Sequence, residues 1–415
     1  MRAFEITTEA KKKPKLLKPR DPNWREMDAL RKSGAAGSHN DKTKAIPRKQ
    51  KYKDNVTEAA VGREFNHVED LVFTNPDDGA KRAVNILKSM ETDSSDVAVK
   101  WDGNPTVYWG REDDGTFRLV GKNNWGKEEG KSSSPEELEK FINSRGKGED
   151  WRPKFAKDMA TLWDIFEKAT PVDYRGYVYG DLLFHQGKPY AGSDGSISFT
   201  PNQTTYNVKT ESEIGRRLAK SKVAVAAHAT YGYFGDKTGD PISDVKAFNG
   251  NPDLVVLGQQ YVSKAPAVNA DNLGNIEKVA NKSQANIAKF FANQPGLSDM
   301  GNIFYTFVNQ MSRAKKLSEL NTNSFTNWLK NSKVSVNKQA KILAMIDADS
   351  QTVADTFYLI TEIMKAKDEI IAELDAAEGD VTATTGGKPG GEGFVKTKDK
   401  VKLVPRDRWT PFRAD

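Results

Sequence analysis

Residues Val97 to Gly110 read Val-Ala-Val-Lys-Trp-Asp-Gly-Asn-Pro-Thr-Val-Tyr-Trp-Gly. Two apolar runs flank a polar centre, a pattern typical of two β-strands joined by a tight corner. The corner carries Lys100, followed two residues later by Asp102 and then by Gly103. We therefore expect a lysine side chain held at the end of a sheet and directed into the cavity that the sheet lines.

The composition indicates a soluble and rather polar protein. The chain of 415 residues is long enough for two or more hydrophobic cores. Hydrophobic residues make up 37% and charged residues 29%, and no run of about 18 apolar residues predicts a membrane span. The N-terminus lacks the apolar centre of a secretion signal, which favours a cytoplasmic location. The net charge of +6 suits a polyanionic partner without requiring one.

The chain contains no cysteine, which excludes disulfides, thiolate zinc sites and a cysteine nucleophile. Its four histidines lack the spacing of metal ligands, and they are His39, His67, His185 and His228. A zinc enzyme is therefore disfavoured. A bound metal ion would need oxygen ligands, and Mg²⁺ is the natural candidate.

The pattern along the chain divides it into three regions. Residues 1–55 are basic and poor in large apolar residues, so we expect a disordered or peripheral arm. This arm either contacts nucleic acid phosphates, docks to another protein or is a solvated tail. Residues 56–265 together with 380–415 carry strand patterns and are expected to form one β-rich domain. Residues 266–379 carry apolar residues at helical spacing and indicate a helical insertion.

Apolar periodicity locates the elements of these regions. The predicted strands are Thr116–Val120, Arg175–Phe184, Lys222–Tyr233 and Asp253–Leu257, and helices are predicted over Pro135–Asn143 and Phe155–Ala169. The insertion predicts helices over Asn275–Asn293, Ile303–Lys316, Phe325–Lys330, Val336–Asp347 and Thr352–Ala377. Thr382–Gly391 is rich in glycine and predicts a flexible linker. Glu392–Val395 and Lys400–Pro405 predict two strands joined by a charged turn.

Glu69 and Asp70 lie shortly before the predicted helix Ala80–Met90. Two adjacent carboxylates are a candidate metal pair. Near a helix start, however, acidic residues more often cap the helix or face solvent. We therefore interpret Glu69 and Asp70 as caps or surface charges.

Four motifs in order resemble nucleotidyltransferase motifs I, III, IV and V of ATP-dependent DNA ligases, RNA ligases and mRNA capping enzymes. They are Lys100 with Asp102 and Gly103, Asp181 after a glycine in an apolar strand, Glu392 in Glu-Gly-Phe-Val, and Lys400 with Lys402. Lys-x-Asp-Gly alone is a weak signal, and the order of all four makes it a good one. The resemblance implies an α+β fold with an antiparallel, β-rich nucleotidyltransferase (ATP-grasp-like ligase adenylation) domain.

The chemistry that the resemblance implies explains these residue types. Lys100 attacks the α-phosphate of ATP and must first lose its proton. Asp181 and Glu392 are expected to hold Mg²⁺, while Lys400 and Lys402 offset the charge on the phosphates. In the family, residues such as Asp102 and Gly103 shape the corner and approach the nucleotide ribose.

The chain departs from the family pattern in several places. Lys122 occupies the region where the family has an arginine after the lysine motif, and Ala98 stands where many polynucleotide ligases have a glutamate. Asp181 replaces the commoner glutamate. The helical insertion separates Asp181 from Glu392, and no room is left after Lys402 for a C-terminal OB-fold. These features favour an RNA-ligase-like or minimal ligase.

The leading hypothesis is thus an ATP-dependent polynucleotide ligase, acting on DNA or RNA through a covalent lysyl-AMP. Alternatives are a nucleotidyltransferase with a non-nucleic-acid acceptor and a non-catalytic protein that binds nucleic acid. The basic arm is similar to leaders of marine bacteriophage proteins, which implies a phage-encoded protein in the host cytoplasm. Tyr231 and Tyr233 are candidates for stacking on adenine, although core packing explains them equally well. His185 and His228 are expected to be structural.

Overall fold

A computed structural model describes residues 65–144, 151–186, 190–193, 195–242, 244–292, 296–377 and 379–406, which belong to one compact unit. The predicted basic arm over residues 1–55 lies outside the described residues. The protein is of mixed α+β class, with 47% helix and 21% strand, and antiparallel pairing dominates its sheets. Among the described residues, no helix has the length and apolar character needed to cross a membrane.

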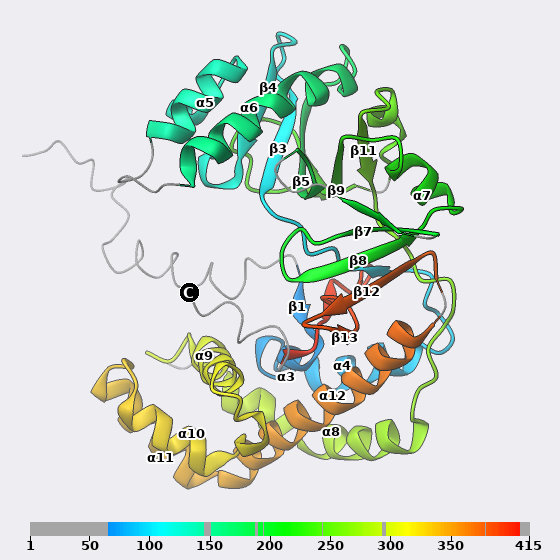
Figure 1. The fold of residues 1–415 in the computed structure, drawn as a ribbon. Coiled ribbons are helices and arrows are strands. Elements are labelled where there is room, and N and C mark those ends of the chain that lie inside the picture. The colour runs from blue at the N-terminus through cyan, green and yellow to red at the C-terminus, as the bar shows by residue number, and fades with distance from the viewer. Residues whose placement is uncertain are drawn as a thin grey trace, which may run out of the picture. The chain divides into compact units, whose positions relative to one another are not determined.

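The first sheet contains the strand of Asp181 and the strand that follows the predicted corner (Figure 1). Its strands run in the order β10 (Asp240–Pro241), β9 (Val223–Tyr231), β5 (Gly176–Phe184), β3 (Thr106–Arg111) and β4 (Phe117–Gly121), and β11 (Leu254–Leu257) pairs in parallel with β9. Helices α5 (Pro135–Ser144) and α6 (Arg152–Ala169) pack on one face, where Trp109 meets Phe166 at 5.1 Å between ring centroids. Because strand side chains alternate, the opposite face carries Thr106 and Asp181, which are directly paired.

The second sheet corrects the prediction of a flexible linker over residues 382–391. Its strand order is β13 (Lys388–Pro389), β12 (Val381–Thr385), β8 (Thr204–Lys209), β7 (Ser196–Phe199) and β6 (Ala191–Ser193), with α7 (Glu213–Leu218) beside it. β12 pairs with β8 from Val381 to Thr385. Gly386 and Gly387 have positive φ and make the hairpin turn. The glycines thus mark a turn, and the threonines that precede them suit a strand.

The third sheet joins segments from both ends of the chain. Its order is β1 (Asn66–His67), β15 (Val401–Leu403), β14 (Phe394–Lys396) and β2 (Val97–Val99), which confirms the predicted strand pair and charged turn. One face packs on helices, as Figure 1 shows. The helices that share this core are α3 (Leu71–Thr74), α4 (Gly79–Ser89), α8 (Ala270–Phe291), α9 (Met300–Arg313), α10 (Thr322–Asn331), α11 (Val336–Ala348) and α12 (Ser350–Ala376). Of these, α12 contacts β15, while α10 and α11 pack on α12. The predicted insertion is therefore helical, and it shares one core with α4, β14 and β15.

Short 3-10 helices complete the described elements, and they are η1 (Val68–Asp70), η2 (Lys122–Asn124), η3 (Glu128–Gly130), η4 (Lys246–Asn249) and η5 (Leu317–Glu319). η1 contains Glu69 and Asp70, and both are buried. The interpretation of these carboxylates as caps or surface charges is wrong. Their cation partners, Lys367 and Arg406, lie 298 and 336 positions further along the chain, respectively.

The buried charge cluster, defined as Glu69, Asp70, Lys367 and Arg406, joins η1, α12 and the segment after β15. Lys367 Nζ donates to Glu69 Oε1 at 3.0 Å, and Arg406 Nη2 donates to Asp70 Oδ1 at 2.6 Å. Burial by itself would raise the pKa of Glu69, but Lys367 and Arg406 lower it overall. Burial and the neighbouring Glu69 raise the pKa of Asp70.

Candidate functional site

The Lys100 corner is clamped by backbone contacts to two sheets. β2 ends at Val99, and the N–H of Lys100 donates to Gly393 O at 2.9 Å, just before β14. The N–H of Asp102 donates to Tyr206 Oη at 2.6 Å. Between them, the buried Trp101 ring lies 4.7 Å from that of Tyr206, in the core shared by the first and second sheets. The corner therefore has a fixed direction.

Lys100 Nζ forms an ion pair with Glu392 Oε2. Only 3% of the Glu392 side chain is exposed, against 28% for Lys100. The glycine after Glu392 is required by the backbone, since Gly393 has φ +118 and an added Cβ would lie 2.1 Å from Leu403 O. Glu-Gly-Phe-Val thus lets β14 approach β15 while its glutamate turns toward a lysine 292 positions away.

Asp181 lies beside Lys100 on the central strand β5. Thr106 Oγ1 donates to Asp181 Oδ1 at 2.5 Å, and His228 Nε2 lies 3.0 Å from Asp181 Oδ2. Burial opposes ionisation, but the hydrogen bond and charge of His228, with smaller effects of Thr106 and Lys100, lower the pKa of Asp181 overall. Asp181 is therefore a carboxylate at neutral pH.

Gly103 allows the Lys100 corner to approach β5 closely. A Cβ added at Gly103 would lie 2.5 Å from Asp181 Cβ and 2.8 Å from Leu182 O. The next residue also contacts β5, because the N–H of Asn104 donates to Leu182 O at 2.9 Å. The glycine of the Lys-x-Asp-Gly motif thus brings the lysine corner against the strand of Asp181.

A cavity of about 200 Å³, here called the Lys100 cavity, opens between the first and third sheets. Its polar lining combines a cation, a carboxylate, an imidazole, a phenol and an amide, from Lys100, Asp181, His228, Tyr179 and Gln259. Val395 and Phe65 contribute apolar surface. This combination suits an organic anion that has both a charged part and a flat apolar part.

Asp102 does not line the Lys100 cavity. Its side chain is buried beside Asn202, whose Nδ2 donates to Asp102 Oδ1 at 3.1 Å. Burial, and then the charge of Glu392, raise the pKa of Asp102, and the hydrogen bond from Asn202 only partly offsets them. Asp102 shapes the corner from behind.

The three other predicted lysines lie in different places. Lys402 is paired directly with Val395, so both side chains lie on the face of the third sheet that borders the Lys100 cavity. Lys400 is exposed in the turn before β15, with φ +54, at the other end of β14 from Gly393. Lys122 is exposed in η2 and lines a separate groove. Lys402 thus lies on the sheet face that borders the cavity without lining it, and its charge acts on Asp70, whereas Lys400 and Lys122 lie elsewhere.

The aromatic candidates for adenine stacking are not in the Lys100 cavity. Tyr231 packs against Tyr108 and Trp125, with ring centroids 5.5 and 5.4 Å apart, respectively, and Tyr233 is 67% exposed. The first sheet contributes the Tyr179 ring to the wall of the Lys100 cavity, and this ring lies 5.6 Å from that of His228. Core packing therefore explains Tyr231.

The residues present fit a magnesium ion only together with a phosphate ligand. Within the described part of the chain, no three His, Asp or Glu side chains gather as a metal cluster. Asp181 and Glu392 supply oxygen from two sides of Lys100. Mg²⁺ bound with a nucleotide usually takes one or two protein carboxylates and completes its shell with phosphate and water, so Asp181 and Glu392 are the residues that would hold it.

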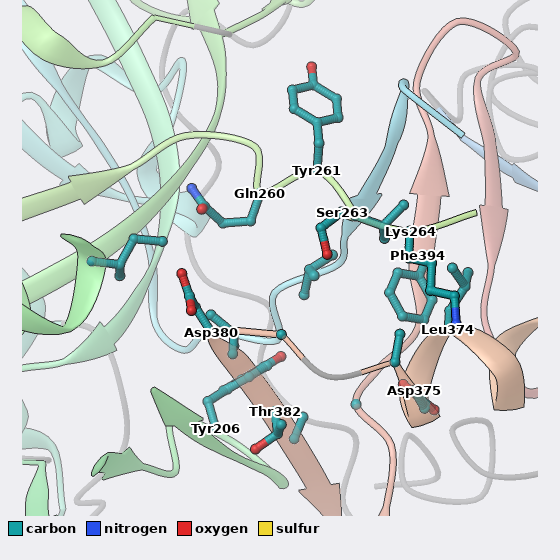
Figure 2. Close-up of a pocket in the computed structure, with 18 of the residues that line it drawn as sticks. Tyr206, Gln260, Tyr261, Ser263, Lys264, Leu374, Asp375, Asp380, Thr382 and Phe394 are labelled. Carbon is teal, nitrogen blue, oxygen red and sulfur yellow. The ribbon is translucent and has the colours of Figure 1, made fainter. Parts of the chain in front are cut away.

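A larger cavity of about 400 Å³ lies along the other side of the Gly393 segment (Figure 2). Acidic and basic side chains both line it, namely Asp375, Asp380, Lys209 and Lys264. Tyr206, which holds the Asp102 N–H, extends into it, while Tyr261 points away from its centre. None of the predicted charged site residues lines this cavity. The chemistry of the lining therefore favours the smaller Lys100 cavity.

His228 was expected to be structural, and its contact with Asp181 in the wall of the Lys100 cavity is compatible with such a role. Replacing His228 with leucine should lower the free energy of unfolding by about 1–3 kcal/mol at pH 7, because an oxygen of the partly buried Asp181 carboxylate loses its donor. Urea unfolding would measure the loss. Thr230→Val, two residues along the same strand, is the control, with an expected loss below about 0.5 kcal/mol. Equal losses in the two variants would mean that His228 does not stabilise the fold through its contact with Asp181.

The His228→Leu effect should also depend on pH. The pKa of Asp181 is lowered in the folded protein, so its stabilising contribution is present above the unfolded value of about 3.9 and is lost as pH falls through the folded value. The difference between native protein and variant should therefore shrink below about pH 4.

The sequence matches the family DUF6267, described as a family of unknown function, over residues 63–411. The match spans every residue of the Lys100 cavity and all strands of the three sheets. No curated protein and no solved structure matches the chain. The match establishes the family of the chain but indicates neither a ligand nor a reaction.

Proposed function

Because the chain belongs to DUF6267, a family of unknown function, its reaction has to be argued from its own residues, and we propose an ATP-dependent polynucleotide ligase. The Lys100 amine forms a bond to the α-phosphorus of ATP, and pyrophosphate leaves. The AMP then passes to the 5′-phosphate of a nucleic acid end, releasing the lysine. Finally a 3′-hydroxyl attacks that phosphate, and AMP leaves as the phosphodiester forms.

The observation that carries this proposal is the ion pair between Lys100 and Glu392, next to Asp181. Three of the four motifs thereby meet at one cavity, although Glu392 is 292 positions from Lys100 in the chain. A lysine whose role was only to end a strand would have no need of a buried glutamate and an ionised aspartate beside it. The cavity lies between antiparallel sheets, which is in keeping with a nucleotidyltransferase fold.

The contacts of Lys100 suit the proposed chemistry. Glu392 accepts a hydrogen bond from Nζ and is therefore positioned to take the proton that the amine must lose before attack. Lys402, on the face of the third sheet that borders the cavity, would offset charge on the phosphates. Mg²⁺ bound to Asp181 together with ATP would add to that neutralisation while Glu392 takes the proton.

The first test is the covalent adduct. The protein incubated with α-labelled ATP and Mg²⁺ should retain the label after denaturation, and the bond should be acid-labile, as a phosphoramidate is. Lys100→Arg should abolish the label, because an arginine stays protonated at working pH and cannot act as the nucleophile. Lys88→Arg, in a partly exposed ion pair with Glu277, is the control and should label normally.

The outcome decides between the proposal and its rivals. Absence of any adduct, or an adduct that survives in Lys100→Arg, would overturn the mechanism. An adduct without sealing of DNA or RNA ends would indicate an acceptor other than nucleic acid. Salt-dependent DNA binding without an adduct would indicate a non-catalytic nucleic-acid-binding protein. Repeating the assay with GTP would establish which nucleotide is the donor.

A further inference from the structure

We propose that a groove next to the Lys100 cavity binds unpaired nucleotides, so that the acceptor is a single-stranded end and not a nick in a duplex. The role of this groove in ligation rests on the proposed function, whereas strand binding there does not. The groove encloses about 270 Å³ between the ends of β3 and β4 and the start of α6. The lining residues used here are Thr106, Lys122, Trp151, Arg152 and Phe155.

Trp151 gives this groove an aromatic platform. The side chain is 56% exposed, although large aromatic residues of this kind are usually well covered. Its ring is supported from within the same helix end, since the Phe155 ring lies 5.7 Å away edge-on and the Arg152 guanidinium lies 4.8 Å from the ring centroid. A supported, exposed indole is the kind of surface on which an unpaired base stacks.

The charges of the groove complement a phosphate backbone. Lys122 is exposed on the β4 side, and Arg152 begins α6 on the other side. α6 has 18 residues, and the positive end of its dipole lies at this side of the groove. Cations on both sides of an aromatic ring favour a strand whose phosphates flank a stacked base.

Thr106 connects the groove to the proposed reaction site. It lines the groove, and its hydroxyl donates to Asp181 in the Lys100 cavity. A strand end lying in the groove is therefore one side chain away from the cavity in which AMP would be attached to Lys100. In a duplex, both faces of each base are covered by stacking neighbours, so a base can lie on Trp151 only when it is unpaired.

Fluorescence anisotropy with a labelled ten-nucleotide strand, as DNA and as RNA, would test the groove against the same sequence as a duplex. The native protein should bind the single strand at least tenfold more tightly. Trp151→Ala should weaken that binding about tenfold and leave the salt dependence unchanged. Lys122→Ala should lower the slope of log K against log salt by about 0.7 to 1.

Tyr233→Ala removes another exposed aromatic side chain, which lies outside the groove, and should leave binding unchanged. Both Trp151 and Lys122 are exposed, and melting temperatures would establish that the variants stay folded. Equal affinity for duplex and strand, or unchanged binding by Trp151→Ala, would overturn the proposal.

Adduct formation separates this proposal from the proposed function. Trp151→Ala should label Lys100 with AMP at the native rate, while transfer of AMP to a single-stranded end falls about tenfold. Native transfer by Trp151→Ala would overturn the role of the groove in ligation. If the native protein forms no adduct but binds strands through Trp151, the ligase proposal fails and the groove remains a site for unpaired nucleotides.

Discussion

Replacing Lys367 with methionine is expected to lower the free energy of unfolding by about 3–5 kcal/mol at pH 7. Lys367 is fully buried on α12, and its Nζ donates to Glu69 Oε1 and to Val404 O. Methionine keeps the size of the side chain but removes its charge. Two buried carboxylates, Glu69 and Asp70, would then share the single guanidinium of Arg406. Urea unfolding at fixed pH measures the loss.

Lys365→Met is a matched control on the same helix. Lys365 pairs with Glu362 one turn away, and 61% of its side chain is exposed. Exposed pairs of this kind contribute little, so the expected loss is below about 0.5 kcal/mol. Similar losses in the two variants would mean that the buried charge cluster does not hold η1, α12 and the end of the chain together.

The Lys367→Met effect should shrink as the pH falls. The native cations lower the pKa of Glu69, so its contribution is present above the unfolded value of about 4.3 and is lost through the folded value. Without Lys367, burial should raise this pKa instead. A raised folded pKa costs stability only above the unfolded value, so the variant's penalty disappears near pH 4. The native contribution is lost at lower pH, as the pH falls through the lowered folded value of Glu69, so the difference should shrink in two steps.

The local sequence pattern was sufficient to predict those parts of the fold that depend on residues close together in the chain. The strand, corner and strand around Lys100 follow from apolar runs and a glycine turn, and the β14–β15 pair follows from its charged turn. The meeting of Lys100 with Asp181 and Glu392 was expected from motif order alone. It needed the resemblance, because nothing in the periodicity relates residues 292 positions apart.

Distant partners explain what the sequence did not reveal. Glu69 and Asp70 look like surface charges until Lys367 and Arg406 are placed beside them. Residues 382–391 look like a linker because glycine content is local information, whereas pairing with β8 is tertiary. In each case the decisive contact is with a segment far away in the chain.

The contact between His228 and Asp181 can be understood from the pairing of β5 and β9. Asp181 is paired with Ala226, and the register of β5 and β9 shifts between Tyr179 and Gly180, which leaves His228 as an extra residue of β9 next to this pair. His228 occupies that position in a strand otherwise made mostly of small residues. The contact of this imidazole with Asp181 therefore depends on an irregularity of strand pairing, which the sequence alone does not reveal.

Gly103→Ala should reduce the rate of lysyl-AMP formation on the order of 100-fold, which is the scale of loss for a displacement of about 1 Å in a reacting group. The added methyl would lie 2.5 Å from Asp181 Cβ, so the corner and β5 must separate. Neither neighbour yields easily, because β5 is paired on both sides and Tyr206 holds the N–H of Asp102. The methyl should also cost about 1–3 kcal/mol of stability.

Gly121→Ala is the control that separates displacement from the mere gain of a methyl group. Gly121 ends β4 with φ −79, and nothing lies within 4 Å of an added Cβ. Its adduct rate and melting temperature should equal those of the native protein. If Gly103→Ala labels at the native rate while losing stability, the spacing between Lys100 and Asp181 does not matter for the chemistry, and Asp181 acts only in folding. A loss of rate at unchanged affinity for ATP would instead indicate that this spacing sets the position of the amine at the phosphorus.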